Sequence, residues 1–181
     1  IYTISLIDAL PMCSITNNTA CSNSGCRWTP GSCGTGSCSG CSAYIDNGDG
    51  TVNDSLTGLV WAKDANLMVT RDPSFDADGT AGDGAVTWQH ALDYVAKLNS
   101  ENYLNHNDWV LPNINELKSL VNAQLFNPAL PLNHPFTNVQ SYFYWSSTSY
   151  AYYTHYAWVV YMGYGYVGLS GKTYSYYVWP V

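Results

Sequence analysis

The sequence predicts an α+β fold made of small twisted antiparallel sheets, two helices and long loops. Over residues 158–162, the side chains of Trp158, Val160 and Met162 fall on one face and those of Val159 and Tyr161 on the other, which is the period-2 pattern of a half-buried strand. Two stretches near residues 87–98 and 113–121 instead repeat apolar residues at helical spacing. Residues 122–142 contain three prolines and little regular pattern, as expected for a long loop that carries function or is fixed by packing.

Further strands are predicted on both sides of the helices. Residues 44–52 read as two extended pieces joined by a turn, and residues 57–61 as the next strand. Asp46 and Asp49 in that turn lack the spacing of a calcium loop, so a tight turn is expected. Residues 108–112 are predicted to form a short buried strand that ends at Pro112, and residues 173–179 a last strand after Gly171.

Each helix has a recognisable first residue. Thr87 stands before Trp88 and can cap the first helix, whose apolar face contains Ala91, Leu92, Val95 and Leu98. Asn113 and Glu116 have the spacing of a capping box and predict the start of the second helix.

Composition excludes several classes of partner. The 181 residues carry a formal net charge of −7, with only six Lys and Arg. This leaves no basic patch, so we expect no nucleic-acid partner and no binding to anionic membranes. No apolar run reaches the length of a membrane span, so no membrane insertion is expected.

Cysteines divide the chain into a segment at 1–43 and a domain at 44–181. All six cysteines lie in the first part: Cys13, Cys21, Cys26, Cys33, Cys38 and Cys41. An even number in a Gly/Ser/Thr-rich segment favours disulfides in an oxidising compartment, and hence an extracellular or surface-displayed protein. A zinc site that includes Cys38-x-x-Cys41 is the alternative.

The segment from Ser141 to the end has an unusual composition. It holds twelve of the 16 tyrosines, and no Asp or Glu follows Glu116. Tyr, Ser and Gly together are typical of antibody-like recognition surfaces, because Tyr gives a large amphipathic contact at low entropic cost. The alternative is a Tyr-rich strand packed on both faces.

Few residues have the pattern of a catalytic or metal site. Asp76, Asp78 and Asp83 in a Gly-rich loop are candidates for holding a cation, but solvated loop carboxylates are the favoured explanation. The four histidines show no metal-ligand spacing, and the C-terminal segment lacks the paired carboxylates of a glycosidase. We expect no catalytic residue, no metal and no cofactor.

Six motifs resemble those of the collagen-like-adhesin C-terminal domain family, over about residues 44–181. They are Asp49-Gly50-Thr51-Val52, Thr57-Gly58-Leu59-Val60-Trp61, Val86-Thr87-Trp88, Asp108-Trp109-Val110-Leu111-Pro112, Glu116-Leu117-Lys118-Ser119-Leu120 and Tyr144-Trp145-Ser146-Ser147-Thr148. The resemblance implies a C-type lectin fold. Val110 departs from it, because the family usually has Arg there.

The last segment is similar to a subset of that fold, the variable proteins of diversity-generating retroelements. In that subset adenine-directed mutagenesis randomises Asn-type codons, which implies a variable segment at about residues 142–178. Trp145, Trp158, Met162, Lys172 and Trp179 would then be fixed. The implied ligand-binding residues are Tyr152, Tyr153, His155, Tyr156, Val159, Tyr161, Tyr164, Tyr166, Leu169, Ser170, Tyr174 and Tyr176.

The resemblance implies a non-enzymatic protein that binds a protein or glycan on another cell or particle surface. A glycan-binding adhesin is the second hypothesis, since aromatic side chains stack on sugar rings. An enzyme of the formylglycine-generating type is the third, but many such enzymes use C-terminal cysteines and none follows Cys41 here. We further expect Trp145, Trp158, Val160 and Trp179 to be buried and the tyrosines to share one contiguous exposed face.

Overall fold

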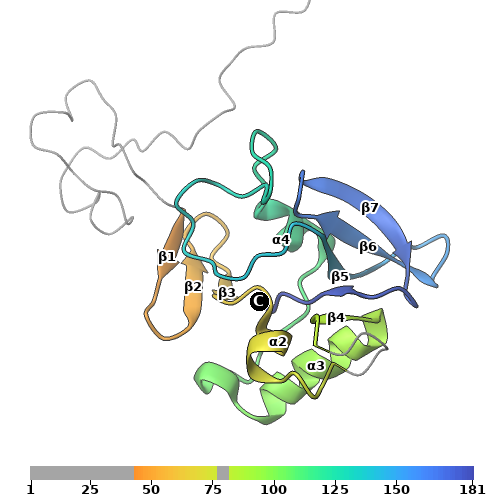
Figure 1. Cartoon of the computed structure of the whole chain (residues 1–181), viewed down its shortest axis with the longest axis horizontal. Coiled ribbons are helices and arrows are strands. Elements are labelled where there is room, and N and C mark those ends of the chain that lie inside the picture. Colours follow the sequence, from red (N-terminus) through yellow and green to blue (C-terminus); the bar gives the residue numbers. More distant parts are fainter. Residues whose placement is uncertain (1–42, 77–81) are drawn as a thin grey trace, which may run out of the picture. The chain divides into compact units, whose positions relative to one another are not determined.

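The computed structural model describes residues 43–76 and 82–181, and this part of the chain is an α+β domain (Figure 1). All six cysteines of the predicted disulfide or zinc segment, and Asp78, lie outside the described residues. Two sheets are present in the described part. The first is antiparallel, in the order β1 (Tyr44–Asp46), β2 (Thr51–Asp54), β3 (Val60–Ala62).

The acidic residues between β1 and β2 accept hydrogen bonds from the backbone of their own turn. Asp46 Oδ1 accepts a hydrogen bond from the Gly48 N–H at 3.0 Å, and Asp49 Oδ1 accepts one from the Thr51 N–H at 2.9 Å. Gly48 and Gly50 have φ of 78° and 95°, a region that glycine enters without strain. The predicted tight turn is therefore correct.

Both predicted helices form, together with two shorter ones. α3 (Trp88–Ser100) buries Ala91, Tyr94, Val95 and Leu98, although Thr87 makes no side-chain cap. α4 (Ile114–Ser119) begins with the predicted capping box, in which Asn113 and Glu116 bond each other's backbone N–H. The two shorter ones, α2 (Leu67–Arg71) and the 3₁₀ turn η1 (Tyr103–Asn105), were not predicted from the sequence.

The second sheet has five strands in the order β4-β8-β5-β6-β7. Its strands are β4 (Ala85–Val86), β5 (Phe143–Ser149), β6 (Tyr156–Tyr161), β7 (Tyr166–Gly171) and β8 (Tyr176–Tyr177). β5 and β8 run parallel, and the other neighbours are antiparallel. The predicted strand at 173–179 is thus reduced to the two residues of β8.

The end of the chain connects the two sheets. The Ala62 N–H donates to Pro180 O at 3.0 Å, and Trp179 Nε1 donates to Ala62 O at 2.9 Å. Val110 and Val181 exchange two backbone hydrogen bonds of 2.8 and 3.1 Å. Residues 108–112 therefore pair with the terminus at one position, but they do not form the strand that the sequence predicted.

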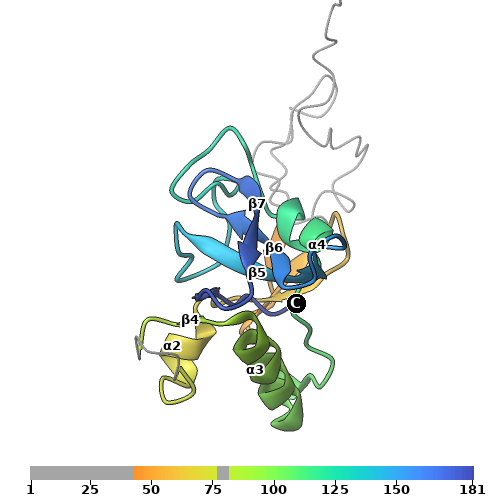
Figure 2. The ribbon, with the colours of Figure 1, turned by 90° about the vertical axis from the view of Figure 1, so that its right-hand side faces the viewer.

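Helices cover both faces of the central sheet. On one face, Trp145, Ala157 and Val159 pack with α3, and on the other, Tyr144, Val160 and Met162 pack with α4. The two helices are labelled in Figure 2. The middle of β6 is therefore buried on both sides, which is the alternative that the sequence left open. Side chains are presented mainly by the ends of β6, by β7 and by the loops.

Residues 122–142 are irregular but fixed to both sheets. The Asn127 and Ala129 N–H groups donate to Gly163 O and Met162 O, at 2.8 and 2.7 Å. The Thr137 N–H donates to Lys63 O at 2.9 Å. Within residues 43–76 and 82–181, no helix is long and apolar enough to cross a membrane.

Candidate functional site

The register of β6 with β7 divides the exposed side chains between two faces of the sheet. Directly opposite residues of an antiparallel pair share a face. Trp158 is paired with Leu169 and Tyr156 with Gly171, on the α4 side. Tyr161 is paired with both Tyr166 and Phe143, on the α3 side. The predicted single contiguous face is therefore wrong, because alternation places neighbouring positions on opposite faces.

The pocket surface lies at the 150–156 loop and consists of Tyr150, Tyr152, Tyr153, His155, Tyr156, Trp158 and Leu169. Its rings form a connected series: the Tyr150 and Trp158 centroids are 5.9 Å apart, and those of His155 and Tyr156 are 4.7 Å apart. Five of its members line a hollow of ≈ 360 Å³: Tyr150, Tyr153, His155, Tyr156 and Leu169. A hollow of this size and lining accepts one ring or one large side chain.

The aromatic surface lies at the β6–β7 turn and consists of Phe126, Tyr142, Phe143, Tyr161, Tyr164, Tyr166 and Tyr176. Tyr164 stacks between Tyr161 at 5.7 Å and Phe126 at 6.5 Å between ring centroids. Phe143 is 4.8 Å from Tyr161 and 5.0 Å from Tyr176. Tyr164 and Tyr166 are 63% and 62% exposed, so this surface can contact a ligand broadly.

Glycines hold the tyrosines against the strands. A Cβ on Gly163 would lie 2.4 Å from Tyr161 Cε1, and a Cβ on Gly168 would lie 2.7 Å from Tyr166 Cε1. Each ring therefore rests on backbone that has no side chain. The glycines between the tyrosines therefore allow the rings of Tyr161 and Tyr166 to lie against the backbone, in addition to shaping the turn.

Charge is nearly absent from both surfaces. Lys172 is the one Lys, Arg, Asp or Glu after Lys118, and it is held by Trp88 and Ser149. Burial, with a smaller contribution from Asp83, raises the pKa of Tyr177 beside the aromatic surface, so this hydroxyl stays protonated at neutral pH. Contacts here depend on area, stacking and neutral hydrogen bonds.

The acidic candidates serve the backbone of their own loop. The buried Asp76 accepts hydrogen bonds from the Gly82 and Gly84 N–H groups at 2.9 and 2.7 Å, and Asp83 accepts one from the Ala85 N–H at 2.8 Å. In the described ranges, no three His, Cys, Asp or Glu side chains are grouped as metal ligands.

The structure corrects part of the predicted ligand-binding set. Val159 is 1% exposed and Ser170 is 8% exposed, so neither side chain reaches the surface. Val159 packs with Trp145 and α3, and Ser170 shares a 3.0 Å hydrogen bond with Tyr176. Trp158, expected in the core, is only half-buried, whereas Trp145, Val160 and Trp179 are buried as expected.

The remaining predicted residues are at least partly accessible. Tyr161 and Tyr176 are half-buried. The exposed ones are Tyr152, Tyr153, His155, Tyr156, Tyr164, Tyr166, Leu169 and Tyr174. Sequence reasoning missed Phe126, which is 69% exposed, and Tyr142. An apolar ring in the irregular 122–142 loop was the available signal for Phe126.

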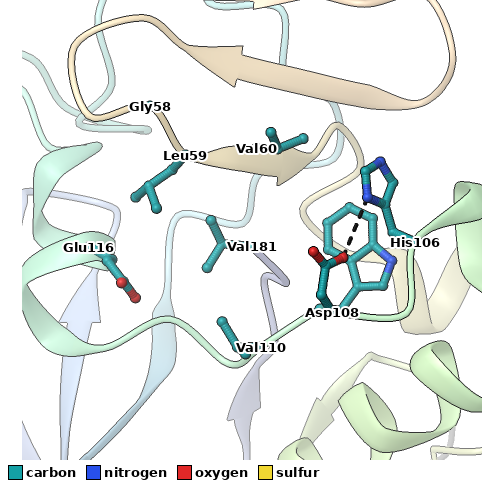
Figure 3. Close-up of a pocket in the computed structure, with 9 residues that line it drawn as sticks. Gly58, Leu59, Val60, His106, Asp108, Val110, Glu116 and Val181 are labelled. Carbon is teal, nitrogen blue, oxygen red and sulfur yellow. Dashed lines mark ion pairs between the residues drawn. The ribbon is translucent and has the colours of Figure 1, made fainter.

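A second hollow, of ≈ 280 Å³, is lined in part by Val110, Glu116, His106 and Val181 (Figure 3). Val110, at the position where the family resemblance implies Arg, is 50% exposed there. Glu116 accepts the Asn113 N–H at 2.7 Å, and His106 Nδ1 lies 3.4 Å from Asp108 Oδ1. These polar groups are thus engaged within the chain.

The fold and its two surfaces define an α+β domain with exposed, almost uncharged clusters of aromatic residues. The chain belongs to the Lcl C-terminal domain family, whose model matches residues 50–181. This confirms the family that the sequence motifs indicated. No curated protein and no solved structure matched the chain.

Proposed function

We propose that this protein is a non-enzymatic binding protein that presents the aromatic surface and the pocket surface to a ligand on another cell or particle. The observation that carries the proposal is the exposure of many large aromatic side chains on a rigid scaffold. Tyr and Trp are enriched in binding hot spots, and large exposed apolar patches mark interaction sites. The proposal includes extracellular or surface display.

Buried positions that form the scaffold are separate from exposed positions that can contact a ligand. This separation supports assignment to the variable proteins of diversity-generating retroelements, with a C-type-lectin-like fold. Three of the five positions that such a system leaves unchanged, Trp145, Met162 and Trp179, are fully buried, and Trp158 and Lys172 are half-buried. Eight of the twelve implied ligand-binding positions, Tyr164 and Tyr166 among them, are exposed. Buried Val159 and Ser170 are exceptions, where substitutions must remain small to be tolerated.

Sequencing of the coding locus tests this assignment. The proposal expects a near-duplicate of the segment encoding residues 142–178 beside a reverse transcriptase gene, and sibling sequences that differ at the exposed positions. Siblings that vary equally at Trp145 and Tyr164 would contradict it.

A glycan-binding adhesin is the second candidate, and the hollow of the pocket surface favours it. Tyr150, Tyr153 and Tyr156 offer ring faces and hydroxyls around a space that accommodates one sugar ring. Binding of the full chain to a glycan array tests this candidate. Tyr156→Ala changes the lining of the hollow, and Tyr164→Ala, on the aromatic surface, is the matched control. The glycan hypothesis requires that Tyr156→Ala lose glycan binding and that Tyr164→Ala keep it.

A further inference from the structure

β7 is the edge strand of the five-stranded sheet, and it is long for an edge (Figure 1). It has six residues, whereas the other sheet edges of the described chain, β4, β1 and β3, have two, three and three. Short edge strands are one way in which proteins avoid pairing with other chains. β7 lacks that protection.

The hydrogen bonds of β6 show which backbone groups of β7 point outward. Tyr156 O accepts from the Tyr150 N–H on the β5 side, whereas His155 O and Tyr161 O accept from Lys172 and Gly165 on the β7 side. Backbone groups alternate in direction along a strand. With the observed register, Tyr166, Gly168 and Ser170 therefore bond β6, and Val167 and Leu169 direct their N–H and C=O away from the sheet.

These outward groups of Val167 and Leu169 have no hydrogen-bond partner in the part of the chain that the structure describes. The strand contains no charged residue and no proline, which are the usual guards of an open edge. Lys172, directly after it, is held inward, with Nζ 2.6 Å from Ser149 Oγ. The edge is therefore an open template for another extended strand.

The pocket surface continues this edge. Leu169 both lies on β7 and lines the ≈ 360 Å³ hollow together with Tyr153, His155 and Tyr156. A strand added beside β7 would place the side chain opposite Leu169 on the same face of the sheet, next to the hollow. Strand addition of this kind obtains affinity from the backbone and specificity from pockets for alternate side chains.

We propose that β7 binds an extended segment of a protein ligand, which adds as a sixth strand and seats one uncharged aromatic or aliphatic side chain in the hollow. The alternating N–H and C=O groups match a polypeptide backbone, and the uncharged edge and lining match an uncharged segment. This inference rests on the proposed function and names the class of its ligand, a protein rather than a glycan.

The test uses the full chain and a displayed library of linear peptides. A selected peptide is resynthesised with a single N-methyl group at each backbone nitrogen in turn. Methylation at every second residue should weaken binding about tenfold, or about 1.4 kcal/mol, while the intervening positions are tolerated. Losses without this alternation, or failure to select any peptide, would overturn the inference.

Substitutions in the protein test the same edge as the changes in the peptide. Leu169→Pro removes the outward N–H without removing a bond to β6, and edge strands tolerate proline. Leu169→Ala is the matched control, because it keeps the N–H and shortens the same side chain. We expect peptide binding to be lost in the first variant and retained, though weaker, in the second, with circular dichroism verifying the fold.

Further outcomes separate this inference from the proposed function. Peptide binding that requires Tyr156 or Tyr164 but is indifferent to N-methylation and to Leu169→Pro would support the aromatic surfaces and reject the edge. Indifference to all four changes would reject both. A dimer of the chain that Leu169→Pro dissociates would show that the edge takes a second copy, which also overturns the inference.

Discussion

Lys172 Nζ lies 3.7 Å from the ring centroid of Trp88, and it also donates to Ser149 Oγ at 2.6 Å. The backbone of Lys172 extends the same junction, since its N–H donates to His155 O and its C=O accepts from the Trp88 N–H. One residue thus joins the first turn of α3, the end of β5 and the loop that carries the pocket surface.

Replacing Lys172 by Met should therefore destabilise the domain by about 1 kcal/mol, because the variant loses a partly desolvated cation–π contact. Lys172→Arg should lose much less, since guanidinium also stacks on Trp. Chemical denaturation of both variants measures the effect. An equal loss of stability in the two variants would show that a positive charge over the Trp88 ring does not contribute.

The buried tryptophans and the exposed tyrosines should differ sharply in their effect on stability. Trp145 is fully buried, and its Nε1 donates to Val86 O at 2.7 Å. Trp145→Ala should cost roughly 3 to 5 kcal/mol of unfolding free energy, whereas Tyr164→Ala should leave the melting temperature nearly unchanged. Similar losses for the two would contradict the division into scaffold and display. Trp158→Ala should fall between them, because Trp158 is half-buried.

Two glycines of the β6–β7 hairpin should respond differently to alanine. Gly165 has φ of 72°, and its added Cβ would lie 2.4 Å from Val121 Cγ1, so Gly165→Ala should cost about 2 kcal/mol or more. Gly168→Ala meets only the ring of exposed Tyr166 at short range, which can swing into solvent. It should change stability little and reduce any binding that uses Tyr166. Thermal melts of both variants decide between these outcomes.

Acid should unfold the domain partly through Asp72. Burial alone would raise the pKa of this carboxyl, but hydrogen bonds from Lys97, Arg71 and Tyr94 lower it below its ordinary value. A folded pKa below the unfolded value gives stability that is present above about pH 4 and is lost as pH falls through the folded pKa.

Asp72→Asn should therefore be less stable than the wild type at neutral pH, by about 2 kcal/mol, and the two should converge near pH 2. Asp93→Asn is the matched control, since Asp93 is an exposed carboxylate of α3 that accepts one hydrogen bond from Gln89. Denaturation from pH 2 to 7 makes the comparison. A constant difference at all pH values would remove the ion-pair explanation.

Local patterns in the sequence were enough to predict the elements whose causes are local. The Asn113 and Glu116 capping box, the α3 apolar face and the Asn47 to Gly50 turn form as expected. The family motifs were also sufficient to place residues 50–181 in the correct family.

What the sequence did not reveal depends on long-range packing. Alternation along β6 identifies two faces, but it does not say that α3 covers Val159 while α4 covers Val160. The strand expected at residues 108–112 failed because its backbone pairs only with Val181, the far end of the chain. Phe126 joins Tyr164 through a loop whose path no local pattern specifies.

Ligand binding should depend on the aromatic residues and require no metal. No Asp or Glu follows Glu116, so the C-terminal strands lack the carboxylates that calcium needs. Two or three tyrosines should dominate, each costing about 2 kcal/mol or more when truncated to Ala. Since the surfaces carry almost no charge, affinity should change little with ionic strength.

Affinity is measured for the wild type and for Tyr156→Ala, Tyr161→Ala and Tyr164→Ala, with and without EDTA and at two salt concentrations. Ser119→Ala, at an exposed position of α4, serves as the control. Loss of binding in EDTA, or retention in all three tyrosine variants, would move the site away from both surfaces.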